Sequence, residues 1–479
     1  MKIHVLPEPG LQFGSGGVHV DIRAGLAKHG TFDRGAPNVP VPIGVGLIGA
    51  AATLDKVRDW IESSRNGIAS RADEKLPELR PAFPGMREEI FGTRLAISDV
   101  TTRSISRLEL QAALEGQNPM GRVVDLFMDH ARDLAARGHL NVLVVAPSAE
   151  VFALGDARPV PADAPLDEAQ EDTTPKHIPN FHDTFKARAL ELAAPCQILR
   201  PDTYGGGSTR TRGSRRPTLQ DPATRAWNFH TALYYKAGGV PWRLVKHSAA
   251  RPTCYVGASF FKSIEGDRLA TSVAQVFNER GEGLILQGGN ATIDRRDLTP
   301  HLSAEDAHKL LANGLAAYRR EHGNMPARVL VHKTSYFNNA EIEGCRAAAK
   351  AERVEVLDLV SVRRAGTRLL RAAVPAVVRG TTLTFDDRGG IVYLKGTVPY
   401  FRTYPGMYVP RALEFTLDDG ETPPVELAKE LLDLSKLNFN NTQFDSGDPI
   451  TVRAARRVGD ILKHVSADRA VQSRFRFFT

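Results

Sequence analysis

The stretch A-L-Y-Y-K-A-G-G-V-P-W-R-L, from Ala232 to Leu244, does most to decide the fold. It ends an amphipathic run with Lys236, and a Gly-Gly pair followed by a rigid Pro-Trp-Arg stops that run. Upstream, Asp221 supplies an N-cap and Pro222 a first helical position, where a proline sacrifices no hydrogen bond. The sequence therefore predicts a helix bracketed at both ends, with Lys236 in its last turn.

The composition is that of a globular protein of two or three domains. The 479 residues exceed what one compact core accommodates. A net charge of +7 is compatible with a polyanionic partner without requiring one. The three cysteines are too widely spaced for a metal-ligand pattern or a disulfide framework, which suits a reducing compartment. We expect neither a signal peptide nor a membrane span, and hence a cytoplasmic protein.

Strands and helices alternate through the first half of the chain. The hydrophobic pattern predicts strands at 40–48, 140–145 and 197–199, and helices at 53–63, 123–137 and 181–192. The Pro-, Asp- and Glu-rich segment 158–176 predicts a mobile surface excursion, and 204–217 reads as a Gly-, Thr- and Arg-rich loop. This alternation predicts one doubly wound α/β domain.

A second α/β unit begins near Pro252. The pattern predicts strands at 254–261, 283–287, 328–332, 354–360, 381–385, 391–394 and 413–417. It predicts helices at 304–322, 424–433 and 450–465. Strands that come first, followed by mixed helices and strands, fit an RNase H-like fold.

Four polar residues of the first half form a donor-rich set. His182 and Lys186 share one helix face in its first two turns, where the helix dipole favours an anion. Gln197 lies on the next strand and Lys236 on the later helix. Such a set suits a terminal phosphate. Alone, a His and a Lys four residues apart are more often a solvated helix face.

The block from Ala232 to Leu244 resembles the junction between the MID and PIWI domains of Argonaute proteins. The resemblance implies a Rossmann-like MID domain within residues 1–250 and an RNase H-like PIWI domain in 251–479. In this family a Tyr or His, a Lys, a Gln and a later Lys bind the guide's 5′ phosphate in that order. By resemblance these are His182, Lys186, Gln197 and Lys236.

Further charge and metal ligands are implied less directly. Many relatives carry a polar residue one turn before the last lysine, where this chain has Ala232. Charge could come instead from Arg225, Arg210 or Arg212, although loop arginines also serve solubility.

Some Argonautes place a divalent cation between the guide phosphates and the C-terminal carboxylate. The resemblance therefore implies Mg²⁺ with Thr479 as ligand, the alternative being a packed hydrophobic tail.

The acidic tetrad of an active PIWI domain is missing. Its first aspartate aligns with Ser259 in Y-V-G-A-S-F-F, and its third acid with Thr334 in L-V-H-K-T-S-Y-F. No acid or histidine occurs at 452–456, and Glu282 alone completes nothing. Because two-metal cleavage needs several carboxylates, we expect an inactive PIWI domain. Basic residues there would contact the nucleic-acid backbone; they are Lys262, Lys333, Arg453, Arg456 and Arg457.

The whole chain resembles a short prokaryotic Argonaute, including L-N-F-N-N-T-Q-F-D-S-G-D-P-I-T-V-R at 437–453. The resemblance implies a guide RNA, single-stranded target DNA from plasmids or phages, and a heterodimer with an APAZ protein. That partner carries an effector NADase, either sirtuin-like, which is favoured, or TIR, whose activation depletes NAD and stops the cell.

Two other functions remain open from the sequence. One is a guide-directed endonuclease that uses Asp294, Asp297 or Asp448. The other is a nucleotide-binding metabolic enzyme, although the glycines at 14–17 lack the strand–helix context of a dinucleotide loop.

Overall fold

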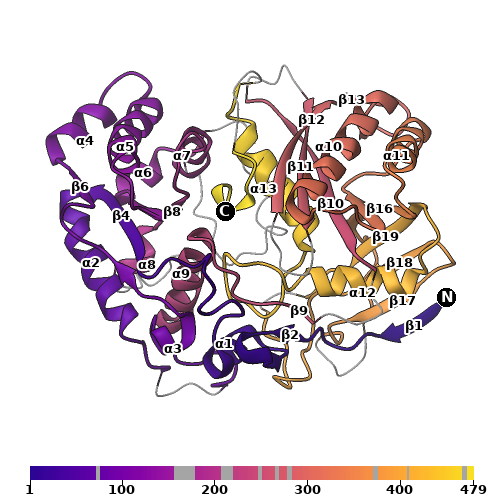
Figure 1. Cartoon of the computed structure of the whole chain (residues 1–479), viewed down its shortest axis with the longest axis horizontal. Coiled ribbons are helices and arrows are strands. Elements are labelled where there is room, and N and C mark those ends of the chain that lie inside the picture. The colour runs from indigo at the N-terminus through magenta and orange to yellow at the C-terminus, as the bar shows by residue number, and fades with distance from the viewer. Residues whose placement is uncertain are drawn as a thin grey trace.

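The computed structural model describes residues 1–71, 76–155, 179–205, 220–245, 251–264, 269–277, 283–370, 376–406, 409–466 and 472–479. Two α/β halves lie side by side, and the end of the chain lies between them (Figure 1). The predicted excursion at 158–176 lies outside the described residues, as does most of the loop at 204–217.

The first half is built on a parallel sheet with strand order β5-β4-β7-β8, and β6 also pairs with β4. These strands are β4 (Ile43–Ala50), β5 (Leu95–Ala96), β6 (Thr102–Ile105), β7 (Val142–Ala146) and β8 (Cys196–Ile198). The side chains of β7 are buried throughout, as expected for a parallel strand covered on both faces.

Helices cover both faces of this sheet. On one face α2 (Ala51–Arg65) and α9 (Pro222–Lys236) pack against Val45, Leu47 and Val144. On the other, α4 (Arg107–Leu114), α5 (Pro119–Ala136) and α7 (Phe181–Ala189) pack against Ile48 and Val145. The first half is therefore doubly wound, as the sequence predicts.

The ends of α9 follow the predicted chemistry. The Asp221 carboxylate accepts hydrogen bonds from the main-chain N–H groups of Ala223 and Thr224. At the other end Gly238 has a φ of +117°, which side chains rarely tolerate. A Cβ on Gly239 would lie 2.2 Å from the Tyr234 ring. These two glycines fix where the helix stops and place Lys236 in its last turn.

The second half contains a nine-stranded sheet of order β1-β17-β18-β19-β16-β15-β10-β11-β12. Three strands form an antiparallel meander: β10 (Thr253–Lys262), β11 (Leu269–Phe277) and β12 (Gly283–Asn290). Next to β10, the strands β15 (Arg328–Lys333) and β16 (Val356–Arg364) run parallel to it. Three antiparallel strands followed by two parallel ones are the core of an RNase H-like fold.

The remaining strands extend this sheet by antiparallel pairing. They are β19 (Leu413–Asp419), β18 (Gly389–Val392), β17 (Thr381–Thr384) and β1 (Lys2–Val5). Because β1 pairs with β17, the first residues of the chain join the sheet of the second half, although the predicted boundary assigned residues 1–250 to the first. The two halves are thus α/β units of the predicted kinds, and this confirms the fold class.

Helices cover both faces of the large sheet as well. On one side lie α10 (Ala304–His322) and α11 (Asn339–Ala351), and on the other α12 (Pro424–Leu434) and α13 (Ile450–Leu462). The shorter elements are α1 (Ile22–His29), α3 (Glu88–Phe91), α6 (Ala149–Ala153), α8 (Pro201–Tyr204), β2 (Leu11–Gln12), β3 (Val18–His19), β9 (Arg243–Leu244), β13 (Thr292–Ile293), β14 (Pro300–His301), and the 3₁₀ turns Gly14–Gly16 and Phe475–Phe477.

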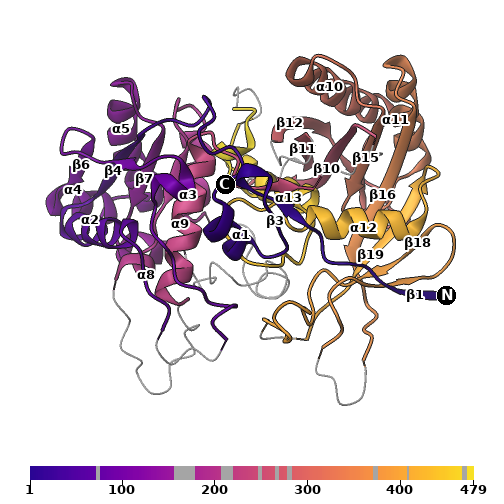
Figure 2. The ribbon, with the colours of Figure 1, turned by 60° about the horizontal axis from the view of Figure 1, so that its bottom comes forward.

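One hydrophobic core joins the two halves. It contains Trp227 and Trp242 of the first half, Phe439 and Ile461 of the second, and Phe478 near the end of the chain. The Trp242 indole packs edge-on against Phe439, with ring centroids 5.0 Å apart, and donates to the main-chain oxygen of Lys436 at 3.0 Å. Figure 2 shows α9 and α13 on either side of this junction. The P-W-R segment therefore anchors one half to the other.

No helix among the described residues is long and apolar enough to cross a membrane.

Candidate phosphate-binding site

The end of the chain lies among the four residues predicted to bind a phosphate. Lys186 Nζ donates to the main-chain oxygens of Cys196 and Thr479, and Lys236 Nζ donates to Thr479 Oγ1 at 3.0 Å. Gln197 follows Cys196 on β8, and His182 lies one turn before Lys186 on α7. The structure therefore brings Lys186 and Lys236 together at Thr479, with His182 on the same helix as Lys186 and Gln197 next to Cys196 on β8.

Both lysines are buried cations, each about 1% exposed. Burial lowers the pKa of Lys186 to about 8. Burial, together with the neighbouring Lys186 ammonium, holds the pKa of Lys236 well below its usual value. Within the described part of the chain, neither ammonium forms an ion pair with an Asp or Glu carboxylate. Two adjacent buried ammonium groups with no Asp or Glu partner are costly, so this site is suited to an anionic ligand.

His182 contributes a neutral imidazole. Burial and the adjacent Arg457 guanidinium lower its pKa to about 4. Its Nδ1 lies 2.7 Å from Arg457 Nη2 and 3.0 Å from Asp183 Oδ1, so the ring contacts both the guanidinium and the carboxylate.

Gln197 offers an unused acceptor. Its Nε2 donates to the main-chain oxygen of Ile198 at 3.1 Å, whereas its buried Oε1 has no hydrogen-bond partner among the described residues. Oxygen atoms are the ligands that Mg²⁺ prefers, usually together with water and phosphate oxygens. Gln197 Oε1 is therefore an oxygen atom of the kind that Mg²⁺ binds.

Two residues from the second half complete the site, and neither of them was predicted there from the sequence. Asn440 Oδ1 accepts from Lys236 Nζ at 2.9 Å. Arg457, on α13, contacts His182 and forms an ion pair with Asp183 at 3.0 Å. Arg457 thus brings a positive charge to a pocket in which Ala232 supplies none.

The other predicted basic residues lie elsewhere or have protein partners. Arg225 donates to the main-chain oxygens of Asp202 and Thr203 at 2.7 and 2.6 Å, which ties α9 to α8. Arg210 and Arg212 lie outside the described residues. Lys333 is buried, with its Nζ 2.6 Å from the Glu341 carboxylate, so it does not face a nucleic acid. We therefore remove Lys333 from the expected backbone contacts.

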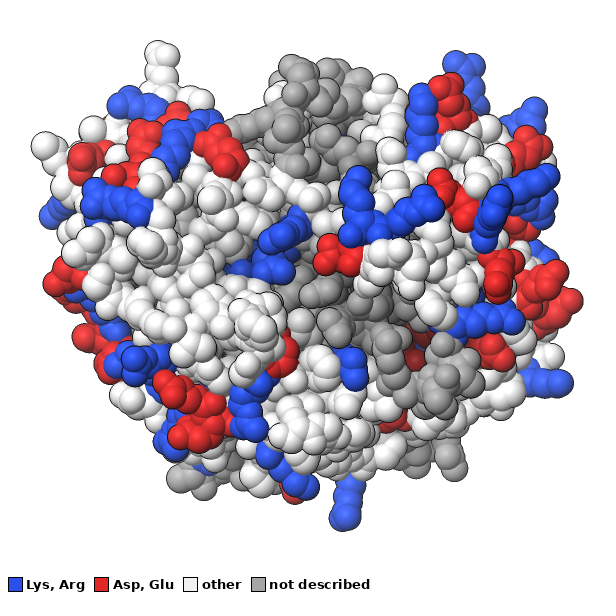
Figure 3. Space-filling view, viewed as in Figure 1, with Lys and Arg blue, Asp and Glu red and all other residues white. Residues whose placement is uncertain are grey.

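Arg453 and Arg456 lie on α13 on the same helix face as Arg457. Arg453 donates to Ser446 Oγ at 2.8 Å, and Arg456 pairs with Asp448 at 3.0 Å. Figure 3 shows basic side chains near the middle of the face on which the two halves meet, with fewer acidic ones there. The half-buried face of α13 thus continues the positive charge away from the pocket.

The two positions that the resemblance aligns with catalytic acids lie side by side. Ala258 of β10 is in register with Lys333 of β15, so Ser259 and Thr334 occupy the next positions, and the Thr334 N–H donates to the Ala258 oxygen at 3.2 Å. Glu282 lies outside the described residues. In the part of the chain that the structure describes, no group of three or more His, Cys, Asp or Glu could hold a metal ion.

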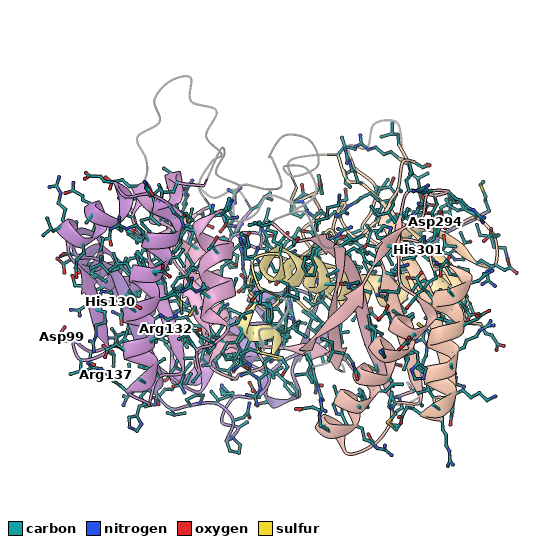
Figure 4. All side chains as sticks on the ribbon, turned by 90° about the horizontal axis from the view of Figure 1, so that it is seen from above. Asp99, His130, Arg132, Arg137, Asp294 and His301 are labelled. Carbon is teal, nitrogen blue, oxygen red and sulfur yellow. The ribbon has the colours of Figure 1, made fainter. Side chains whose placement is uncertain are left out.

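The three aspartates that a guide-directed endonuclease would use all have protein partners. Asp448 is buried between Arg364 and Arg456, each 3.0 Å away. Asp297 lies 2.8 Å from His301 Nε2, and Asp294 Oδ1 accepts from the Arg296 N–H. Figure 4 places Asp294 and His301 in the second half, on the side away from the first.

Solved Argonaute structures match the fold of nearly the whole chain. Clostridium butyricum Argonaute, solved with a guide DNA and a 19-mer target DNA, matches 97% of the chain at 13% identity with a TM-score of 0.66. The chain has the Argonaute fold. Marinitoga piezophila Argonaute, solved with a 5′ OH guide RNA, matches 100% of the chain at 10% identity with a TM-score of 0.58.

The matches to Argonautes come from comparison of structures and not from comparison of sequences. No protein-family model and no curated protein matches the sequence. The chain spans little more than half of the two Argonaute chains, 53% and 59% respectively.

Proposed function

We propose that this chain binds the 5′-phosphorylated end of a short guide, RNA rather than DNA, and pairs that guide with complementary single-stranded DNA. The observation that carries this proposal is the pair of buried ammonium groups, Lys186 and Lys236, which lack an Asp or Glu partner among the described residues. A phosphate monoester is close to a dianion at neutral pH and would compensate both. Base pairing would supply the sequence discrimination, and the basic face of α13 would hold the backbone.

A magnesium ion would be held by Gln197 Oε1 and the Thr479 main-chain oxygen. When bound, it would neutralise charge between the guide phosphates. Lys186 and Lys236 would donate directly to phosphate oxygens, and Arg457, held beside His182, would add a charged donor from the second half. Together these groups would fix the position of the guide's first nucleotide.

We further propose that the chain recognises its target without cutting it, and that an APAZ partner of the same complex carries the effector, a sirtuin-like NADase in preference to TIR. Neutral hydroxyls at Ser259 and Thr334 support the first part, since they cannot replace carboxylates around two divalent ions. The resemblance to short Argonautes supports the second part. NAD depletion on recognition of plasmid or phage DNA would then stop the cell.

One reconstitution separates this function from a guide-directed endonuclease. We expect the complex of chain, partner, guide RNA and labelled matched target to consume NAD while the target stays full length with Mg²⁺ or Mn²⁺. The chain without its partner is expected neither to consume NAD nor to cut the target. A mismatched target is expected to leave NAD unchanged in the full complex. A cut target would favour the endonuclease. Unchanged NAD with an intact target would contradict the proposed activation.

The lysine pKa values predict how binding depends on pH. Because the pKa of Lys186 is about 8 in the free protein, the amine must take up a proton to bind phosphate above that pH. A bound dianion raises this pKa, so affinity for a 5′-phosphorylated guide falls by up to about tenfold per pH unit above about pH 8. Titrating the dissociation constant against pH measures the slope. Lys186→Arg and a 5′-hydroxyl guide should both flatten it, and an equal slope for the two guides would contradict the assignment.

A further inference from the structure

The phosphate pocket contains an acidic side chain. Asp183 follows His182 in the first turn of α7 and is 7% exposed. Its Oδ1 lies 3.0 Å from Arg457 Nη1 and 3.0 Å from His182 Nδ1. Its Oδ2 accepts from Asn180 Nδ2 at 2.8 Å. One carboxylate therefore contacts α7's own cap, the pocket imidazole and a guanidinium from the other half of the molecule.

This carboxylate is ionised in the free protein. Burial acts to raise the pKa of Asp183, but Arg457 and the His182 hydrogen bond outweigh burial and hold the pKa well below its usual value. A negative charge beside a phosphate repels it, so the carboxylate opposes ligand binding by its charge alone. Helix capping does not explain its presence, because the Asn180 side chain already accepts the Asp183 N–H at 2.9 Å.

The surroundings of Arg457 indicate what the carboxylate does. Lys186 and Lys236 lie close enough for Arg457 to lower the pKa of both, so these ammonium groups repel the guanidinium. Asp460, three residues further along α13, attracts it, since Arg457 lowers the pKa of this carboxyl against the effect of burial. Without Asp183, both forces would draw Arg457 away from the lysines and toward Asp460.

Building on the proposed function, we propose that Asp183 is a positioning residue that holds Arg457 in the pocket for the guide's 5′ phosphate. Its carboxylate holds Nη1 of the guanidinium while Nη2 contacts the His182 ring, so α13 and α7 present one joint donor surface. Binding of the phosphate would then depend on contact between the two halves, through these two helices.

The direction of the affinity change in Asp183→Asn distinguishes a positioning role from simple charge repulsion. If Asp183 acted only through its charge, Asp183→Asn would tighten binding of a 5′-phosphorylated guide. We expect the opposite, about a tenfold weaker affinity, because losing the oriented guanidinium outweighs the relief of repulsion. Affinity for the same guide with a 5′ hydroxyl should change less than about twofold, since Arg457 has no phosphate to contact there.

The experiment measures both affinities for the wild type, Asp183→Asn, Arg457→Gln and the double variant. If the residues act as one unit, the double variant is no weaker than either single variant within about twofold. Asp125→Asn is the matched control: it removes a carboxylate that pairs with Arg188 of α7 at 2.8 Å, outside the pocket. This control should leave both affinities unchanged.

The outcomes are distinct. Tighter or unchanged binding by Asp183→Asn, equal losses for the two guides, or additive losses in the double variant would overturn the positioning role alone. A wild type with no preference for the 5′ phosphate would overturn the proposed function instead. Should Asp183→Asn fail to fold, Arg457→Gln, at a side chain 25% exposed, still tests whether phosphate preference depends on α13.

Discussion

The variant Lys186→Met/Lys236→Met is expected to lose affinity for a 5′-phosphorylated guide by about 100-fold or more, and yet to unfold at a higher temperature than the wild type without guide. Each lysine would make charge-assisted bonds to the phosphate, worth about 1.5–3 kcal/mol apiece. In the free protein both are buried without an Asp or Glu partner in the described residues, so methionine of similar length removes a desolvation penalty of about 1–3 kcal/mol. The loss of the lysines' hydrogen bonds to Cys196, Asn440 and Thr479 offsets only part of this gain.

Fluorescence binding and calorimetric unfolding measure the two quantities on the same samples. Lys56→Met/Lys350→Met is the matched control, because it removes two exposed lysines and the same net charge. That control should reduce affinity only as much as a general loss of charge does, and equally for phosphorylated and unphosphorylated guides. Retained affinity in the pocket variant, or a loss of stability as large as the loss of binding, would contradict a ligand-binding role for these lysines.

Gly257→Ala is expected to destabilise the second half by about 3 kcal/mol or more and to weaken guide binding without touching the pocket. A Cβ on Gly257 would lie 2.0 Å from the main-chain oxygen of Thr451 and 2.4 Å from its carbonyl carbon. Both atoms belong to the backbone of α13, which cannot move aside as a side chain can. Because α13 carries Arg453, Arg456 and Arg457, its displacement would disturb the basic face.

Denaturant unfolding and guide affinity measure this effect. Gly366→Ala is the control, since a Cβ there meets nothing within 4 Å and its φ is not left-handed, so its stability should stay unchanged or rise slightly. An unfolding free energy for Gly257→Ala within about 1 kcal/mol of wild type would mean that α13 does not pack on β10 as closely as described.

Elements with a strong local signal could be predicted from the sequence. The helix 304–322 coincides with α10, and the caps of α9 lie at Asp221 and at the Gly-Gly pair. The β-branched run at 140–145 corresponds to β7, which spans Val142–Ala146. In each case periodicity or capping chemistry lies within the element itself.

Elements that depend on distant partners were missed. The strand β1 has four residues, and its partner β17 is nearly the whole chain away, so no local pattern shows the pairing.

The helix α11 was missed for a different reason, because a capping box between Asn338 and Glu341 does mark its start. That signal lies in the sequence and could have located the helix.

The residues of the site fall into the same two groups, those with a local signal and those that depend on distant partners. His182, Lys186, Gln197 and Lys236 belong to elements of one domain, and an ordered motif could point to all four. Asn440 and Arg457 reach the pocket from the second half, and Asp183 gains its meaning only from Arg457. Lys333 was placed on the nucleic acid because charge is visible in a sequence, whereas its buried partner Glu341 is not.

The most direct test of a guide-binding pocket is to extract and end-label the nucleic acid that remains bound to the purified protein, wild type beside Lys186→Ala/Lys236→Ala. We predict short RNA that accepts label only after its 5′ phosphate is removed, abundant in the wild type and lost in the double variant. Equal amounts of bound RNA in both proteins, or none in the wild type even when the partner is co-expressed, would contradict the pocket and leave the Argonaute likeness as one of fold alone.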